Sequence, residues 1–470
     1  MCFLSIFYLF LTFLLFSLPT SFFYDKMIYN MTTSLIISAI TALALILVII
    51  FKPYIQIKKF GIGLYWVVAL SGAILLILFN TILVKDVING FTSTHGVNPI
   101  QILILFISMT SISVFLEDAG FFDIVANFIF ERCKISQTKL FFILYFTVAI
   151  LTIFTSNDII ILTFTPPICI FSKKAKISPI PYLFGEFIAA NTFSLALVIG
   201  NPTNIYLAES VGIGFVEYLS VMILPALLCG TVSGLTIYLL FKKQLAKPIS
   251  NENATCTLES DYKKTTRLEK LPLIVALCHL IVCIILLAVS DFIGLEMWLI
   301  CLILALSLLL FNISYRLITK SGLHKVGHTL KKLPYELIPF VLSMFILVLS
   351  LKINGVTQIL ANFLSTNTTL DTITFGLTST ICANLLNNIP MSVLFAEIVP
   401  SGNLYALFGS IVGSNIGAFI TPVGALAGIM WNKILKNYQV DFSFKKFILY
   451  GSLISIPALI FSLLPLLILI

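Results

Sequence analysis

The sequence predicts an all-α polytopic membrane protein made of two inverted repeats, each with a re-entrant helical hairpin and a discontinuous transmembrane helix. The first supporting observation is composition: 59% of the 470 residues are hydrophobic, 10% are charged, and the mean hydropathy is +1.09. Soluble domains carry roughly 25% charged residues, so this chain belongs in a bilayer. The second is a series of long apolar stretches. The third is a pair of compact polar interruptions, one in each half of the chain.

The apolar stretches are the candidate spans. A helix needs roughly 20 apolar residues to cross the hydrocarbon core, so the shortest stretch, 337–351, must recruit polar neighbours. Segment 117–138 spreads its charges as an amphipathic surface helix does, and 357–366 is a short surface segment. The candidate spans are 34–51, 64–84, 99–116, 215–241, 272–289, 294–311, 337–351 and 447–468.

The domain organisation follows from these spans. Residues 34–241 form the first transmembrane repeat, the polar stretch 242–271 is a cytoplasmic linker, and residues 272–470 form the second repeat. Residues 1–33 begin with an apolar run that lacks a basic n-region, which makes a poor secretory signal. They are either an additional span or an extension upstream of a start at a later methionine.

The first half contains a hairpin and a broken helix. Two apolar arms, 139–155 and 159–172, flank the polar turn Ser156-Asn157-Asp158. Because both ends of the pair are basic, the loop-charge rule allows either a re-entrant hairpin or two full crossings. The three-residue turn favours the hairpin. The next span, 181–199, is interrupted at Gly200-Asn201-Pro202-Thr203-Asn204 before 205–212 completes the crossing.

The second half repeats this plan. Arms 371–386 and 391–399 flank Asn387-Asn388-Ile389-Pro390. Segment 404–420 is expected to break around Ser414-Asn415 and Thr421-Pro422-Val423-Gly424 before 425–432 completes the crossing. Proline removes a backbone donor, and broken helices persist in lipid only where they are buried or line a cavity. We therefore expect the two breaks and the two tips to form one interior site.

Lysine and arginine residues set the orientation. With residues 52–59 in the cytoplasm, every Lys and Arg except Lys26, Lys85 and Lys352 lies on the cytoplasmic side, as the positive-inside rule requires. Each half then makes an odd number of crossings, so the second half enters the membrane inverted. Inverted repeats with broken helices near the midplane are typical of secondary transporters. The sequence therefore predicts a multi-pass transporter of the cell membrane.

Other functional classes lack their signatures. No G-x-x-x-x-G-K-[ST] motif is present to bind a nucleotide. The net charge of +8 comes from loop cations, which predicts no nucleic-acid partner, and the nine cysteines show no metal-ligand spacing. An intramembrane enzyme using Asp158 would need a partner, but His95, His279, His324 and His328 lie outside both hairpins. We expect no enzymatic activity, no cofactor and no metal centre; a proton or sodium ion would provide the coupling.

The polar tips and breaks supply the candidate substrate-binding residues. Helix N-termini expose unpaired N–H groups and a positive dipole end, which suit an anion or a polar neutral solute. The same residue types also favour plain turns, but their recurrence in both halves favours a site. The candidates are Ser156, Asn157, Asp158, Gly200, Asn201, Thr203, Asn387, Asn388, Asn415, Thr421 and Gly424.

Two acidic residues and one cysteine carry further hypotheses. Asp158 is the candidate coupling residue, because a carboxylate inside the membrane often marks an ion or proton pathway; alternatively it caps the second hairpin arm. Glu186 belongs either to the pathway or to the membrane interface, and Glu397 is expected at the interface. Thiol capture of a metalloid at Cys382 is not favoured, since soft-metal sites gather several thiolates.

The order of the polar motifs resembles a known family. Five motifs, spread between roughly residues 30 and 470, resemble the ion transporter superfamily, and most closely its arsenical resistance (arsenite efflux) permeases. These are Asn157-Asp158 with Thr165-Pro166-Pro167; Gly200-Asn201-Pro202-Thr203-Asn204-Ile205 with Gly212-Ile213-Gly214-Phe215; Pro334-Tyr335-Glu336-Leu337-Ile338-Pro339; Asn387-Asn388-Ile389-Pro390; and Ser414-Asn415-Ile416-Gly417 with Thr421-Pro422-Val423-Gly424.

This resemblance implies an elevator-type transporter, in relatives often a homodimer, that exports arsenite, antimonite or a related small anion against protons. Other members of the superfamily carry citrate or dicarboxylates with sodium, or exchange sodium for protons, and these remain alternatives. Ile159 and Ile160 stand where the arsenite permeases usually have small residues, which narrows the first tip and leaves the substrate open.

Overall fold

A computed structural model describes residues 22–57, 60–92, 97–132, 136–249 and 270–470. In this part of the chain seven helices are long and apolar enough to cross a membrane, and a bent pair of helices, at 81° to each other, raises the number to eight if it is one span. The prediction of an all-α polytopic membrane protein is thereby confirmed. The described residues also contain a small antiparallel hairpin of β1 (Tyr54–Ile57) and β2 (Phe60–Gly63), which the sequence did not predict.

The first half contains the predicted hairpin, followed by the predicted broken helix. Its helices are α2 (Phe22–Phe51), α3 (Leu64–Leu78), α4 (Val84–Thr92), α5 (Pro99–Asp118), α6 (Phe121–Arg132), α7 (Gln137–Phe154), α8 (Asn157–Lys174), α9 (Ile180–Phe193), the 3-10 turns η1 (Ser194–Ala196) and η2 (Val198–Gly200), α10 (Pro202–Val211) and α11 (Phe215–Leu245). Of the predicted 1–33 segment, residues 1–21 lie outside the described residues, and α2 begins at Phe22.

The second half repeats the order of elements. Its helices are α13 (Lys270–Ala288), α14 (Ser290–Ile293), α15 (Met297–Ile318), α16 (His324–Lys331), α17 (Leu337–Ile353), α18 (Val356–Leu364), α19 (Asp371–Leu386), α20 (Asn388–Ile398), α21 (Leu404–Gly417), α22 (Leu426–Asn437) and α23 (Phe444–Leu469). The bent pair is α17 and α18, which places α18 where the short surface segment was expected.

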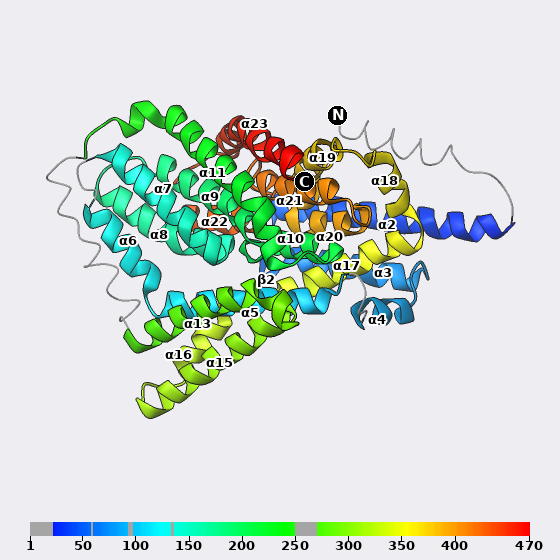
Figure 1. Ribbon diagram of the computed structural model, residues 1–470, viewed down its shortest axis with the longest axis horizontal. Coiled ribbons are helices and arrows are strands. Elements are labelled where there is room, and N and C mark those ends of the chain that lie inside the picture. The colour runs from blue at the N-terminus through cyan, green and yellow to red at the C-terminus, as the bar shows by residue number, and fades with distance from the viewer. Residues whose placement is uncertain (1–21, 58–59, 93–96, 133–135, 250–269) are drawn as a thin grey trace.

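The two halves also share their helix pairings. Helix α3 packs on α17 as α5 packs on α15, and hairpin helix α8 packs on α22 as α20 packs on α10. Figure 1 shows α13, α15 and α16 along the lower edge and α3 and α4 at the lower right, with the hairpins and broken helices above α13, α15 and α16. These pairings cross between the halves, so the site elements of each repeat are held by the other. The inverted orientation itself stays a prediction.

The predicted surface helix 117–138 and the predicted span 64–84 both needed correction. The segment 117–138 is not one helix: α5 continues to Asp118, Gly120 adopts φ +87°, and α6 starts at Phe121. The span 64–84 ends early at Leu78, and Asn80 takes φ +55° before α4 begins. In both cases the chain turns at a residue with a left-handed backbone conformation, and glycine and asparagine tolerate this conformation best.

The positions of both helix breaks also differ from expectation. The first helix was predicted to continue to residue 199, but α9 ends at Phe193. The Asn204 side chain explains this, because its Nδ2 donates to the carbonyls of Ser194 at 2.9 Å and Leu197 at 3.3 Å in place of helical amides. The second was predicted to break around Ser414-Asn415, but α21 continues through both residues to Gly417.

Helices α19 and α21 approach closely through glycine residues. A Cβ at Gly413 would collide with the Gly376 carbonyl oxygen and the Ser379 hydroxyl, and one at Gly409 would collide with the Thr372 carbonyl oxygen. Small residues at such contacts are how membrane helices bring their backbones together, since lipid provides no hydrophobic drive for association. This contact fixes the second hairpin against the second broken helix.

Replacing Gly413 tests this packing. We expect Gly413→Ala to lower the stability by about 1–3 kcal/mol, because backbone atoms at the contact cannot move aside. Thermal unfolding of the detergent-purified protein measures it. Gly327→Ala, on α16 with no atom near the added Cβ, is the matched control and should keep or raise the melting temperature. Equal melting temperatures for both variants would show that the helices separate without cost.

Candidate substrate site

The first tip ends in a helix N-terminus with unpaired polar atoms. Ser156 occupies the N-cap position of α8, and Asn157 and Asp158 are its first two residues. Asn157 Nδ2 donates to Asn191 Oδ1 at 3.3 Å. The Asn157 Oδ1 and Ser156 Oγ atoms are buried, yet neither has a partner among the described residues. Buried polar atoms are normally hydrogen-bonded, so these two have free capacity for a ligand or water.

The second tip is fastened to the second break. Asn387 links α19 to α20 with φ +78° and ψ +153°, a conformation that is almost exclusive to glycine and costs about 1–3 kcal/mol. Its Nδ2 donates to the Val423 carbonyl at 2.9 Å, and its Oδ1 accepts from the Ile389 amide at 3.3 Å. The Asn388 amide donates to the Gly424 carbonyl at 2.9 Å. These bonds hold the strained tip in place.

A glycine shapes each break. A Cβ at Gly200 would collide with the carbonyl oxygen of Ser194, and a Cβ at Gly424 would collide with the carbonyl oxygen of Gly417. In both places the chain folds back against the end of the preceding helix. We therefore assign the two glycines a role in the close turn, which does not depend on substrate contact.

Asn415 joins the two breaks. Its Oδ1 accepts from Asn201 Nδ2 at 2.8 Å and from Ser194 Oγ at 3.1 Å, and its Nδ2 donates to Asn204 Oδ1 at 2.7 Å. Asn201 also caps α10, since its Oδ1 accepts from the Thr203 amide at 3.2 Å. One side chain of the second half therefore meets the polar groups of the first break.

The neighbouring hydroxyls extend this network. Thr203 Oγ1 and Ser414 Oγ lie 3.1 Å apart, and both residues are fully buried. The hydrogen-bonding groups of Asn201, Thr203 and Asn415 are thus largely paired within the protein. Sequence reasoning grouped these three with the substrate ligands; the structure shows them bonded to each other or to their neighbours across the break.

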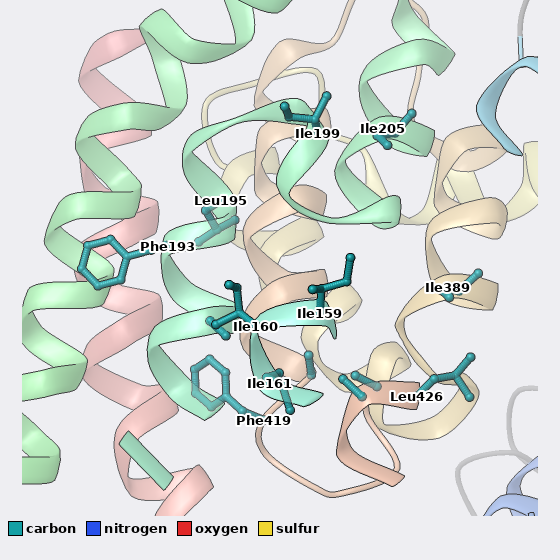
Figure 2. Close-up of a cluster of buried hydrophobic side chains, with 14 of the residues drawn as sticks. Ile159, Ile160, Ile161, Phe193, Leu195, Ile199, Ile205, Ile389, Phe419 and Leu426 are labelled. Atoms are coloured by element: carbon teal, nitrogen blue, oxygen red, sulfur yellow. The ribbon is translucent and has the colours of Figure 1, made fainter. Parts of the chain in front are cut away.

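Four helix N-termini lie around the tips. Helices α8 and α22 pack together at one side, and α10 and α20 at the other. Figure 2 shows residues from the first turns of all four, Ile159, Ile205, Ile389 and Leu426, in one buried cluster. Each N-terminus contributes a partial positive charge and unpaired amides. Thr421 Oγ1, in the break before α22, is a third buried polar atom without a partner among the described residues.

The acidic residues occupy different surroundings. Asp158 is half-buried and has no partner among the described residues; Ser156 takes the N-cap position, so the capping alternative for Asp158 is wrong. Glu186 is fully buried, with both carboxyl oxygens 3.1 Å from Thr165 Oγ1. Its assignment to the pathway or to the membrane interface stays a prediction. Glu397 pairs with Lys352 at 2.6 Å, where the Lys352 side chain is 53% exposed.

Sequence reasoning missed part of this arrangement. Asn191 and Ser194 were not selected, although both are polar residues inside an apolar segment, and that was the available signal. Asn204 and Ser414 appeared only within motifs. A cavity of about 220 Å³, lined by residues that include Gln101, Glu209, Asp291 and Glu296, lies between α5, α10 and α15 and includes none of the tip residues.

Replacing Asn415 tests the joint between the breaks. Asn415→Leu should strongly destabilise the protein, because Asn201, Asn204 and Ser194 would each lose a buried partner at about 1–3 kcal/mol per group. Thermal unfolding in detergent provides the measurement. Asn437→Leu, exposed near the end of α22, is the matched control and should change the melting temperature little. A melting temperature for Asn415→Leu within error of the unmodified protein would refute the joint.

Comparison with known proteins identifies the family. The chain is similar to the arsenical pump membrane protein of Escherichia coli K12, with 26% identity covering 76% of this chain and 84% of that protein. It is also similar to the arsenical pump membrane protein of Yersinia enterocolitica, with 24% identity covering 76% of this chain and 84% of that protein. The solved structure of the Alcanivorax borkumensis YdaH transporter is similar in fold, with a TM-score of 0.52 and 13% identity. The match covers 93% of this chain and 97% of that chain.

The family model described as citrate transporter, CitMHS, matches residues 46–403. This confirms the resemblance to the ion transporter superfamily and the prediction of a membrane transporter that is not an enzyme. The chain belongs to the CitMHS family of membrane transporters.

Proposed function

We propose that this transporter exports a small neutral oxyacid of trivalent arsenic or antimony, coupled to proton entry. The observation that carries the proposal is the group of three unpaired buried polar atoms, Ser156 Oγ, Asn157 Oδ1 and Thr421 Oγ1, at the start of α8 and in the break before α22. Helices α8 and α22 pack together, and on this ground we take the three atoms as parts of one site. Hydroxyl and amide groups of this kind suit a solute that both donates and accepts hydrogen bonds.

The charge of the tips favours a neutral solute over citrate. Segments 155–160, 193–204, 386–391 and 412–426 contain no Lys, Arg or His, and their single ionisable side chain is the acidic Asp158. A polycarboxylate would therefore meet only helix dipoles and one like charge. Arsenous acid is uncharged at neutral pH and needs no cationic partner. The names of the relatives support arsenic, whereas the name of the family model supports citrate transport, which we keep as the alternative.

Alternating access follows from the arrangement of the repeats. We take residues 34–241 and 272–470 as inverted repeats, supported by the repeated element order and the crossed pairings of α8 with α22 and α10 with α20. The two hairpins and broken helices would move as one body, because Asn415 and the second tip bond them together. Transport then requires this body to slide against the helices at the edges of Figure 1.

Asp158 is the proposed proton carrier. It directly follows Ser156 and Asn157, and no described side chain pairs with its carboxyl group. A charged carboxylate is costly in the membrane unless it is paired or protonated, so its protonation can be linked to the occupancy of the neighbouring site. Glu186 already has Thr165 as a partner and is the less exposed of the two acids.

Everted membrane vesicles from a host without its own arsenite exporter test the substrate. With the vesicle interior made acidic, vesicles that contain this protein should accumulate more arsenite and antimonite than control vesicles do. Citrate, with and without sodium, is offered in parallel. Accumulation of citrate without accumulation of arsenite would replace the proposal by its alternative.

Replacing Asp158 tests the coupling. Asp158→Asn cannot carry a proton, so gradient-driven accumulation should fall at least about tenfold. Exchange of labelled for unlabelled substrate should persist, because it needs no net proton movement. Asp86→Asn, in the first turn of α4, is the control and should leave both activities intact. Unchanged gradient-driven accumulation in Asp158→Asn would remove Asp158 as the carrier.

Removing the unpaired hydroxyls separates binding from folding. Ser156→Ala and Thr421→Val should each weaken substrate affinity about 2- to 10-fold, the value of one hydrogen bond, while keeping or raising the melting temperature, because no protein partner is lost. Ser172→Ala is the matched control, since its hydroxyl is also buried without a partner but lies near the opposite end of α8. A loss of stability with unchanged affinity would contradict a substrate role.

A further inference from the structure

Three sulfur atoms from three helices meet outside the substrate site. Met109 lies in the middle of α5, Cys283 in α13 and Cys301 in α15. The Cys283 thiol donates to Met109 Sδ at 3.6 Å and lies 3.8 Å from Cys301 Sγ. Both cysteines are completely buried and Met109 is 3% exposed. Nothing in the proposed transport mechanism uses these sulfurs.

The spacing of the sulfurs fits a bound metal ion. A metal–sulfur bond of about 2.3 Å places two sulfur ligands about 3.8 Å apart in tetrahedral geometry and about 4.0 Å apart in trigonal geometry. The separations of Cys283 Sγ from Met109 Sδ and from Cys301 Sγ are both close to these values. A disulfide would instead require an S–S distance of about 2.05 Å, so the cysteines would have to approach each other considerably.

The donor set selects the kind of ion. Thiolate and thioether ligands are soft and favour Cu(I) among biological metals, whereas Mg²⁺ and Ca²⁺ take oxygen ligands. The surroundings are apolar: Leu280 and Leu287 share a face of α13 with Cys283. A monovalent ion that displaces one thiol proton leaves the site neutral, which a buried apolar site tolerates far better than a net charge.

We propose that Met109, Cys283 and Cys301 form a binding site for one soft monovalent cation, Cu(I) or its analogue Ag(I). One thiol releases its proton to solvent and binds as thiolate, and the second thiol and the thioether complete the coordination. Trivalent arsenic is the competing ligand, since it bonds to two thiols, but it gains little from a thioether. The contribution of Met109 therefore distinguishes the two.

Silver binding by the purified full-length protein tests the site. The background carries Cys2→Ser, Cys133→Ser, Cys256→Ser and Cys278→Ser, which removes the exposed Cys278 and the cysteines outside the described residues. After gel filtration without thiol reductant, we expect about one silver ion per chain and a melting temperature that rises with silver concentration, because the ion binds the folded state. No retained silver and no shift would overturn the proposal.

Variants assign the ligands. Cys283→Ser and Cys301→Ser should each weaken silver binding at least tenfold, and Met109→Leu, which conserves volume, should weaken it several-fold. Cys229→Ser, a buried single cysteine on α11, is the matched control and should bind as the background does. Unchanged binding in Met109→Leu, or an equal melting-temperature shift with arsenite that Cys283→Ser and Cys301→Ser abolish, would overturn the three-sulfur cation site.

X-ray absorption of the Cu(I)-loaded background protein needs no variant at the site. We expect a shell of sulfur neighbours at about 2.3 Å. A shell of nitrogen or oxygen neighbours would refute the proposal even if the serine variants fail to fold. The site is independent of transport, so loss of arsenite transport would leave this result unaffected.

Discussion

The structure depends on satisfying backbone polar groups where helices break inside a bilayer. Lipid offers no hydrogen-bond partner, so each freed amide or carbonyl must be paired within the protein. In the first break, Asn204 takes the carbonyls of Ser194 and Leu197, and Asn415 then holds Asn204 and Asn201. In the second, Asn387 and Asn388 take the carbonyls of Val423 and Gly424. The break of each half is therefore stabilised by asparagine residues, through the side chains of Asn204, Asn415 and Asn387 and the backbone amide of Asn388.

The pattern of satisfied and unsatisfied groups separates scaffold from site. Asn415 and its partners use their capacity on each other, which ties the two halves together. Ser156, Asn157 and Thr421 keep buried atoms without a partner among the described residues, and the half-buried Asp158 directly follows Asn157 in the chain. A buried unpaired atom costs stability, and proteins retain such groups where a ligand or water completes them. We use this contrast, together with the position at a tip or break, to propose which residues contact the substrate; buried atoms elsewhere, such as Ser172 Oγ and Ser233 Oγ, also lack a partner among the described residues.

Much of the fold could be predicted from the sequence, because a segment that crosses lipid must have apolar side chains and must pair its own backbone polar groups. Long apolar stretches had to become helices, and the polar turns at Ser156-Asn157-Asp158 and Asn387-Asn388 fell between helices as expected. The ends of the broken helices were not readable. Whether α9 stops at Phe193 depends on Asn204, eleven residues further along the chain, which competes for the carbonyls that follow the helix. Local propensity contains no information about that competition.

The sequence by itself determined the membrane class and the polar turns at which the helices are interrupted, because both follow from local hydropathy and charge. Only the tertiary structure decided which polar atoms are paired. Asn201 and Asn415 are far apart in the chain yet share a hydrogen bond of 2.8 Å. Likewise, Cys283 and Cys301 lack any sequence spacing typical of a metal site, and only the packing of α13 on α15 brings their sulfurs together. Long-range packing sets such contacts, and no short segment encodes them.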